Sequence, residues 1–459
     1  MKKFLFLTLF MLPFAAFAAE EKPAKRFEIS RNCMISKDVS ADSLGLADVI
    51  ELAMCNNPTT KEAWINTQAG RMAYNGTLGE YLPHVSASGS YSRRWNEQHL
   101  DNAPNVKDSD TTMTGGLSLS WLLYDFGKRE AAVERTFQTM NSLNFAYSGT
   151  LQQVAYDVIS AYYGTLSSVE ALSAARANED ATKKSFDLAS KKFDLGMASK
   201  ADKLQTETSY VQAQLDTTRQ EQVVKNSRAS LAKLMGLPPN MEVRLTPADS
   251  SATDEIMSRS VEDIIEAALK KRPDLKAKVA EVNASYAGVR SASATFFPRF
   301  EGFASKDWND QHAKWGDTKL DTSGYAVGVR VSMPIFTGFE DYYSLRNAKY
   351  QYAAKKEELH QLEQNVELGV VSAYNDYKTS LKSLSLARKM HESALESEKV
   401  ATGQYQAGKG DIIRLMEAQS KLLLARKEMI AAQYGVYTYK IALLKAAGEL
   451  SLKNLGMEQ

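Results

Sequence analysis

The sequence predicts an α/β membrane protein built from two copies of one structural repeat. Two stretches of about 65 residues have the pattern of single helices, and each would extend for roughly 100 Å at about 1.5 Å per residue, more than a compact domain holds. Paired segments in which apolar and small residues alternate precede each long helix, and this period of two is typical of strands. The N-terminus has the pattern of a secretory signal.

The signal pattern consists of three parts. Lys2 and Lys3 form the charged region, residues 4–14 the apolar region, and Ala16-Phe17-Ala18 a small-x-small cleavage site. No later apolar run approaches the roughly 20 residues that a transmembrane helix needs. Any membrane contact of the mature chain is therefore expected to use strands or a surface helix.

A polar N-terminal arm and two short helices are expected next. The first helix should run from about Leu46 to Asn56. Pro58 stands where the first turn of a second helix tolerates proline. Pro83 should end that helix, because proline lacks an amide donor and restricts the residue before it.

The period changes to two after this proline. Apolar residues alternate with serines over 85–92, which predicts a strand that ends at Trp95. A polar loop is expected from about Glu97 to Asp110. The return strand alternates apolar residues with serines over 117–123, which completes a β-hairpin at 84–124.

The first long helix should extend from about Lys128 to Phe193. Its apolar residues recur in steps of three and four that average about 3.5, as in a coiled coil. The pattern breaks at 194–199 and resumes to about Met235, which predicts a helical hairpin at 128–236. The two shorter helices of each half together approach the long helix in length, so we expect them to stack end to end beside it.

The second half of the chain repeats the first. The helical segment 46–53 corresponds to 261–268, and the second half contains a β-hairpin at 299–336 and a helical hairpin at 339–447. Matching positions are Pro58 and Pro273, Pro83 and Pro298, and Gly196 and Gly408. The predicted division is a signal peptide at 1–18, an N-terminal arm at 19–45, a first repeat at 46–236, a linker at 237–258, a second repeat at 259–450 and a C-terminal tail at 451–459.

Composition and motifs exclude several classes of protein. The net charge of +1 argues against a nucleic-acid binder. The five histidines show no metal-ligand spacing, and phosphate loops and nucleophile elbows are missing, so we expect neither an enzyme nor a cofactor. A disulfide between Cys33 and Cys55 and two unpaired thiols are both compatible with the sequence, which supplies no distance.

The predicted strands suit a transmembrane barrel. Each half contributes two strands of roughly ten residues with one apolar face, and tryptophans lie in or beside them, as at a membrane–water interface. Four strands cannot close a barrel, since eight is the usual minimum. Several chains must therefore share one barrel, and three chains would supply twelve strands.

The duplicated helix that ends in proline, the strand entries, and the tip motif around Tyr405 and Gly408 together resemble the TolC-type outer-membrane channels of bacterial efflux pumps and type I secretion systems. The resemblance covers about residues 46–450. It implies a homotrimer in contact with outer-membrane lipid that shares a 12-stranded transmembrane β-barrel, continued by a long periplasmic α-helical barrel. It also implies a passive exit duct opened at its periplasmic tip by an adaptor (membrane fusion) protein and an inner-membrane RND or ABC transporter.

The resemblance assigns roles at the tip. Asp202 and Tyr405 fall on positions that hold the tip closed, and Glu417 falls on an acidic position that lines the constriction. Arg414 replaces a second acidic residue, and it is expected either to pair with Glu417 one turn on or to share a solvated helical face with it. A latch arginine of the family falls on Gly410, so its ion pair is missing.

Further positions follow from the same resemblance. The two helical turns match adaptor-contacting tips, and small polar residues of the strands would line the barrel lumen. The expected tip residues are Leu195, Gly196, Met197, Ala407, Gly408 and Lys409, and the expected lumen residues are Ser86, Ser88, Ser118, Ser120 and Arg330.

The long helices are also compatible with a second function class, a periplasmic coiled-coil adaptor or scaffold protein. Such adaptors usually carry one helical hairpin flanked by globular β domains. This chain instead has two helical hairpins interleaved with alternating strands, which favours the duct.

Overall fold

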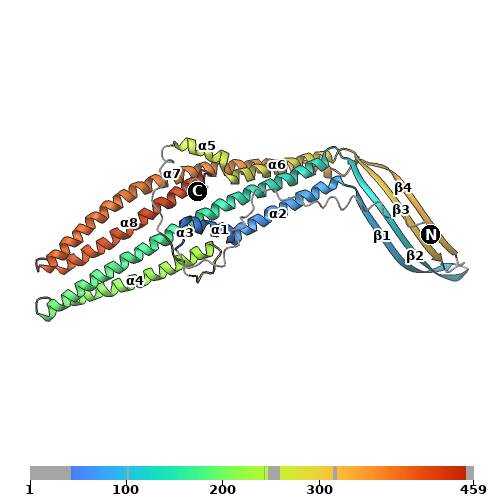
Figure 1. Cartoon of the computed structure of the whole chain (residues 1–459). Coiled ribbons are helices and arrows are strands. Elements are labelled where there is room, and N and C mark those ends of the chain that lie inside the picture. The colour runs from blue at the N-terminus through green and yellow to red at the C-terminus, as the bar shows by residue number, and fades with distance from the viewer. Residues whose placement is uncertain (1–42, 101–102, 242, 247–258, 314–317, 451–459) are drawn as a thin grey trace.

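The computed structural model describes residues 43–100, 103–241, 243–246, 259–313 and 318–450. The molecule is elongated and mostly helical, with one small sheet at one end and two helical hairpins that reach the other end (Figure 1). The predicted signal peptide, most of the arm, Cys33, part of the linker and the tail lie outside the described residues.

Both halves of the chain place the same kinds of element in the same order. The long helices α3 and α7 have 67 residues each, and α4 and α8 have 35 residues each. The first half comprises α1 (Leu46–Asn56), α2 (Pro58–Leu78), the 3-10 turn η2 (Gly79–Tyr81), β1 (His84–Leu100), β2 (Ala103–Tyr124), α3 (Lys128–Asp194) and α4 (Lys200–Leu234). The second half comprises α5 (Val261–Lys271), α6 (Pro273–Ala294), β3 (Arg299–Ala313), β4 (Thr318–Ser332), α7 (Glu340–Gln406) and α8 (Ile412–Ala446).

The strands are longer than the sequence pattern predicted. Trp95 does not end β1, and the loop expected at 97–110 is mostly strand, because Trp95 pairs with Ser109 and Glu97 with Lys107. A ladder of backbone hydrogen bonds continues wherever two antiparallel strands stay in register, whatever their side chains. Hydrophobic alternation marks only the part of the ladder that has an apolar face.

The sheet is antiparallel with the strand order β1-β2-β3-β4. Its register places Ser118 beside Ser86 and Ser305, and Arg330 beside Glu301, so these side chains share one face. The opposite face is apolar over much of its area and includes Val85, Tyr91, Leu117, Leu119, Trp121, Tyr325, Val327, Val329 and Val331. β1 and β4 are the edge strands of the single chain.

The largest hydrophobic core lies at the waist of the helical part. There α1 packs on α3 and α5 packs on α7, and the ends of α4 and α8 meet them (Figure 1). The largest fully buried side chains of this core include Ile50, Ile159, Tyr162, Leu231, Ile264, Val370, Tyr377 and Leu443. Among the described helices, none combines the length and the hydropathy that crossing a membrane requires.

The shorter helices join end to end at this waist, as expected from their lengths. Asn57 caps α2 by accepting a hydrogen bond from the Thr59 amide (2.8 Å), and its own side-chain amide donates to the Leu234 carbonyl at the end of α4 (2.9 Å). Gly236 follows α4 with a φ of +71°, and a Cβ there would lie 2.5 Å from the Asn56 carbonyl oxygen. The first joint therefore depends on contacts between segments about 180 residues apart.

A second joint connects α8 to α6. The Arg272 guanidinium donates to the Ala446 carbonyl at the end of α8 (3.1 Å) and pairs with Asp274 at the start of α6 (2.6 Å). A cation at a helix C-terminus and a carboxylate at an N-terminus both complement the helix dipoles. Each half thus presents a nearly continuous rod, α2 with α4 and α6 with α8, beside its long helix.

Arg129 ties the helices to the sheet. Its guanidinium donates to the Leu122 carbonyl (2.9 Å) and lies 4.0 Å from the ring centroid of Tyr81. Its backbone N–H donates to the buried Asp125 carboxylate (2.8 Å), which caps the start of α3. Trp121 adds a hydrogen bond from its indole N–H to the Tyr81 carbonyl (3.0 Å).

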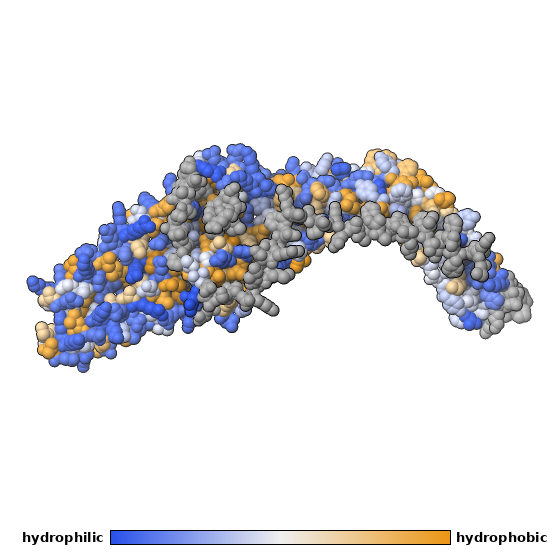
Figure 2. All heavy atoms as spheres, in the orientation of Figure 1, coloured by the Kyte–Doolittle hydropathy of each residue, from blue (hydrophilic) through white to orange (hydrophobic). Residues whose placement is uncertain are grey.

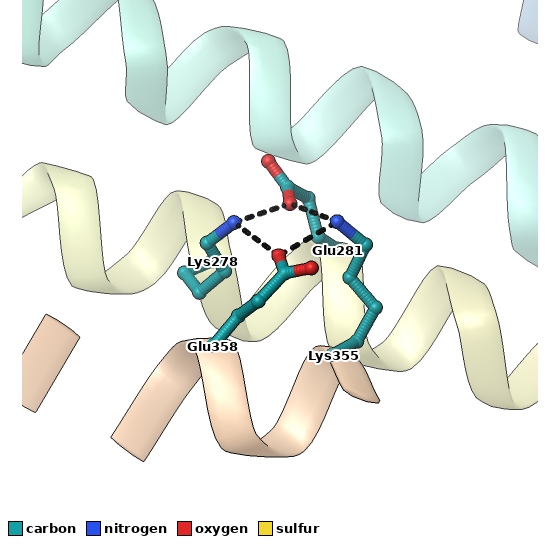
Figure 3. A network of polar contacts seen from close by, with 4 residues as sticks. All are labelled: Lys278, Glu281, Lys355 and Glu358. Carbon is teal, nitrogen blue, oxygen red and sulfur yellow. Dashed lines mark hydrogen bonds and ion pairs between the residues drawn. The ribbon is translucent and has the colours of Figure 1, made fainter. Parts of the chain in front are cut away.

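A four-residue charge network joins α6 to α7 (Figure 3). Lys278 contacts Glu281 (2.8 Å) and Glu358 (3.0 Å), while Lys355 contacts Glu358 (2.8 Å) and Glu281 (3.6 Å). The charges alternate around a closed square, so each group has two opposite neighbours. The network favours one register of α6 on α7 between the waist and the sheet.

Cys55, at the end of α1, is disulfide-bonded. Cys33, its predicted partner, lies outside the described residues, and the pairing of the two stays a prediction.

Candidate gate at the helical tips

Both helical hairpins end in the same turn. At the end of α3, the Met197 amide donates to the Lys192 carbonyl (2.7 Å) and the Gly196 amide to the Phe193 carbonyl (2.9 Å). Gly408 closes the same pair of hydrogen bonds at the end of α7. Both glycines have a φ of +72°, a left-handed conformation that side chains disfavour.

The predicted tip residues lie at the extreme ends of the hairpins and are exposed. Leu195 is 74% exposed and Met197 is 72% exposed. Ala407, Gly408 and Lys409 form an equally open but less apolar turn. Two large apolar side chains at an exposed turn provide a surface suited to contact with another protein.

Tyr405 is the centre of a small second core just behind the tips. It is buried together with Ala401, Ile412, Leu415 and Ala418. Burial, followed by the nearby carboxylates of Asp202 and Asp411, raises the pKa of the Tyr405 hydroxyl. The phenol therefore stays neutral at physiological pH.

Lys192 connects the first helical hairpin to this core. Its ammonium group donates to the Tyr405 carbonyl (2.8 Å) and lies 4.1 Å from the centroid of the same ring. Sequence reasoning missed Lys192. The only sequence signal for Lys192 was its position in the last turn of α3, three residues before the predicted tip residue Leu195.

A second tie links the hairpins farther from the tips. The buried Gln419 side chain of α8 donates to the Ser185 hydroxyl of α3 (3.0 Å). No role was predicted for Gln419 from the sequence. Its amide supplies an inter-helix hydrogen bond between two buried side chains, where a hydrogen bond is stronger than at the surface.

Asp202 begins α4 and closes a capping box. Its carboxylate accepts from the Ser199 amide (3.1 Å), and the Asp202 amide donates to the Ser199 hydroxyl (3.1 Å). The structure brings Asp202 close enough to influence the pKa of Tyr405. Its hydrogen bonds, however, serve its own helix.

Of the two arrangements expected for Arg414 and Glu417, the described part of the chain has the shared exposed face and not the ion pair. Glu417 pairs instead with Lys421 (2.6 Å), because a glutamate four residues before a lysine is the favoured helical geometry. The hydrogen bond from Lys421, then its charge, lower the pKa of Glu417, and Arg414 adds a smaller effect in the same direction.

Gly410, where the family resemblance places a latch arginine, has little space for a side chain. A Cβ there would come within 3.0 Å of both the Gln404 side chain and the Tyr405 amide nitrogen. The turn has therefore closed over the space that a side chain would need, which gives a physical reason for glycine here.

The predicted lumen residues share one face of the sheet. The Ser86 and Ser118 hydroxyls hydrogen-bond across β1 and β2 (2.7 Å), and Ser88 and Ser120 lie on the same face. Arg330 lies 5.1 Å from the Phe303 ring on that face. No group of three or more His, Cys, Asp or Glu side chains in the described ranges could hold a metal ion.

The chain matches a known protein family over most of its length. The model for this family, described as outer membrane efflux protein, matches residues 49–237 and 264–449.

Curated relatives agree with this match. The chain is 26% identical over 416 residues to protein CyaE of Bordetella pertussis, covering 89% of this chain and 85% of that protein. It is 24% identical to the alkaline protease secretion protein AprF of Pseudomonas aeruginosa, covering 90% and 86%. It is 21% identical to the outer membrane protein TolC of Escherichia coli, covering 89% and 83%.

Solved structures share the fold. The outer-membrane channel OprN superposes with a TM-score of 0.75 at 19% identity, covering 88% of this chain and 90% of that chain. Structures of CusC give a TM-score of 0.73 at 18% identity, covering 88% and 91%. The open state of the MtrE channel of Neisseria gonorrhoeae gives 0.70 at 19% identity, covering 88% of each chain.

Proposed function

The chain belongs to the outer membrane efflux protein family, a family of channel proteins of the outer membrane, and we propose that it is a passive exit duct gated at the tips of its two helical hairpins. The helical part extends into the periplasm from the sheet. The observation that carries the gate is the contact of Lys192 in α3 with Tyr405 in α7, because it joins the two hairpins beside their ends.

The duct is a trimer in this proposal. A four-stranded sheet with two unpaired edges and one apolar face is incomplete in a single chain. Three chains would pair β1 of one copy with β4 of the next and close a 12-stranded barrel, with Ser86, Ser118 and Arg330 toward the lumen. The recurrence of equal elements in both halves supports an internal two-fold repeat, so the trimer would have six similar wall units.

The closed gate is held within each chain. Lys192 and the Ser185–Gln419 pair hold α3 against the second hairpin, and Asp202 acts on Tyr405 only through its charge. Opening would separate the hairpins and break these ties. At the constriction, Arg414, Glu417 and Lys421 place both signs of charge in each copy, so Glu417 would not form a purely acidic ring.

Partners would act at the exposed tips. Leu195 and Met197 offer apolar contacts, and the second tip turn with Lys409 a more polar one, to a periplasmic adaptor that couples the duct to an inner-membrane RND or ABC transporter. Relatives are named for efflux, as in the toluene efflux pump outer membrane protein TtgC of Pseudomonas putida, and for secretion, as in AprF. The proposal covers both kinds of system, since the transporter selects the cargo.

The gate is tested by replacing Lys192. A cation–π contact and a charged hydrogen bond are together worth about 1–2 kcal/mol, so Lys192→Gln should raise the open probability of the purified channel in a planar bilayer about five- to thirtyfold. Lys191→Gln is the matched control, because Lys191 is the neighbouring cation in the sequence and its side chain is exposed. Equal behaviour of both variants would remove Lys192 from the gate.

The rival proposal, a periplasmic coiled-coil adaptor, differs in its assembly. If the chain is the proposed duct, we expect an oligomer of three chains that can be extracted from the membrane fraction only with detergent. Recovery of a soluble periplasmic monomer after cell fractionation would contradict the duct, whatever Lys192 does.

A further inference from the structure

An arginine held between two tyrosines lies on α7 just beyond the sheet. Arg346 donates one hydrogen bond to the Tyr342 hydroxyl (3.1 Å) and one to the Tyr350 hydroxyl (2.8 Å). The guanidinium carbon also lies 5.9 and 5.6 Å from the centroids of the two rings. We name these three residues the tyrosine–arginine ladder; they follow one another at i, i+4 and i+8.

The ladder occupies a face of α7 that stays exposed among the residues that the structure describes. Tyr342, Arg346 and Tyr350 are all exposed, as are Tyr343 and Lys349 beside them. The face of α7 toward α6 is a different one, marked by the contact of Tyr286 with Tyr352 (5.4 Å). The remaining side carries only small or polar residues near the sheet, namely Ser344, Asn347 and Gln351.

The ladder continues the apolar surface of the sheet. Alternating residues of β4 end in Val331, and the chain then exposes Met333, Ile335 (95%) and Phe336 (74%) before α7 begins. Phe336 and Phe339 meet edge to face with centroids 5.6 Å apart. Figure 2 shows hydrophobic residues gathered where the helices meet the sheet. An apolar strand face followed by aromatic and basic side chains is the order expected on passing from hydrocarbon to headgroups.

From this continuity we propose that the ladder binds the phosphate of a phospholipid headgroup in the periplasmic leaflet of the outer membrane. Arg346 spends two of its five N–H donors on the tyrosines and keeps three for a ligand. A guanidinium is weakly hydrated and matches two phosphate oxygens at once. Lys349 adds a second cation nearby.

The tyrosines orient the guanidinium. By accepting its hydrogen bonds from both sides along the helix, they fix the fork and leave their own O–H groups to donate to lipid oxygens. The bound headgroup would set the depth of the sheet in the membrane. This inference rests on the outer-membrane location and is independent of the gate and of the cargo.

The test measures how tightly the full chain binds added phospholipid. Native mass spectrometry of the purified, delipidated oligomer, titrated with dioleoyl phosphatidylglycerol, should show about tenfold weaker binding for Arg346→Gln. Arg346→Lys, which keeps the charge but loses the fork, should bind more weakly than wild type yet better than Arg346→Gln.

A matched control lies on the same helix. Lys356 is a cation near a tyrosine, with its ammonium 6.0 Å from the Tyr352 centroid, but it lies farther from the sheet. Lys356→Gln should leave lipid binding unchanged. An equal loss in both variants would mean general attraction of charge and would overturn the site.

Three more outcomes would also overturn the proposal. The first is that dioleoylglycerol, which has no phosphate, binds as well as the phospholipid. The second is that millimolar inorganic phosphate displaces the lipid fully, which would identify a free-anion site. The third is that Arg346→Gln dissociates the oligomer while the lipid bound per intact oligomer stays constant, which would identify a contact between chains.

Discussion

At the scale of single residues, the charge at the proposed constriction depends on neighbours one helical turn away. Glu417 pairs with Lys421, and this lysine rather than Arg414 has the larger influence on its carboxyl group. A carboxylate paired in this way remains charged to lower pH than an isolated one. Lys421, which was not predicted as a tip residue, therefore contributes to the charge of this helix face.

Replacing Lys421 should shift this titration. Lys421→Gln removes the group that lowers the pKa of Glu417, so the carboxylate should be protonated at a higher pH than in the wild type. As pH falls from 7 to 4, cation preference measured by reversal potentials in a planar bilayer should fade earlier in the variant. Lys399→Gln, which removes a 3.8 Å pair with Glu396 on α7, serves as the control. Identical pH profiles for wild type and Lys421→Gln would exclude Glu417 from the constriction.

At the scale of elements, the two joints make long walls from short helices. Asn57 caps α2 and donates to the last carbonyl of α4, while Arg272 pairs with Asp274 at the start of α6 and donates to the last carbonyl of α8. The joints give the last carbonyls of α4 and α8, which have no partner within their own helices, a side-chain donor. They also bring Gly236 against the backbone of Asn56.

Gly236 offers a clean measure of this joint. Gly236→Ala imposes both a left-handed alanine and a 2.5 Å clash with the Asn56 carbonyl oxygen. Gly196→Ala imposes the same backbone conformation, at a φ of +72°, with open space around the new methyl group. We expect thermal unfolding by circular dichroism to show a loss of roughly 1–2 kcal/mol for Gly196→Ala and at least about 2 kcal/mol more for Gly236→Ala. Equal losses would show that the joint can open at little cost.

At the scale of the whole molecule, the two faces of the sheet would meet different solvents in the proposed barrel. Val327 and Ala326 are neighbours on β4 and are both exposed in the single chain, but they belong to opposite faces. The register places Ala326 beside Ser305, on the face of Arg330, and Val327 beside Ala304. Only the second face continues into the aromatic surface at the start of α7.

A lysine scan across this pair should separate lipid from lumen. Val327→Lys should cost about 2–4 kcal/mol near the membrane midplane and reduce the heat-stable oligomer in the outer-membrane fraction. Ala326→Lys should leave it near the wild-type amount, because the lumen side is wet. Loss of oligomer in both variants, or in Ala326→Lys alone, would contradict the assignment of the faces.

Much of the fold and part of the candidate gate could be predicted from residues alone. Period and turn chemistry located the long helices, the breaks at Gly196 and Gly408, and the helix stops near Pro83 and Pro298, because these depend on neighbours within a few positions. The contact of Lys192 with Tyr405 joins residues 213 positions apart, and no local pattern encodes it. For Arg414 and Glu417 the sequence allowed an ion pair or a shared solvated face, and neither alternative includes Lys421, the partner that the i, i+4 geometry favours.

The sequence by itself determined the repeated order of elements, the polar and apolar faces of the strands, and the family. Each of these is written in periodicity or in local motifs. Only the tertiary structure decided how far the strands extend, how Asn57 and Arg272 join the short helices, what holds Tyr405, and that Arg346 lies between two tyrosines beyond an apolar sheet. Such features depend on contacts between groups that are far apart in the sequence and that only folding brings together. They can therefore be identified only once the long helices lie side by side.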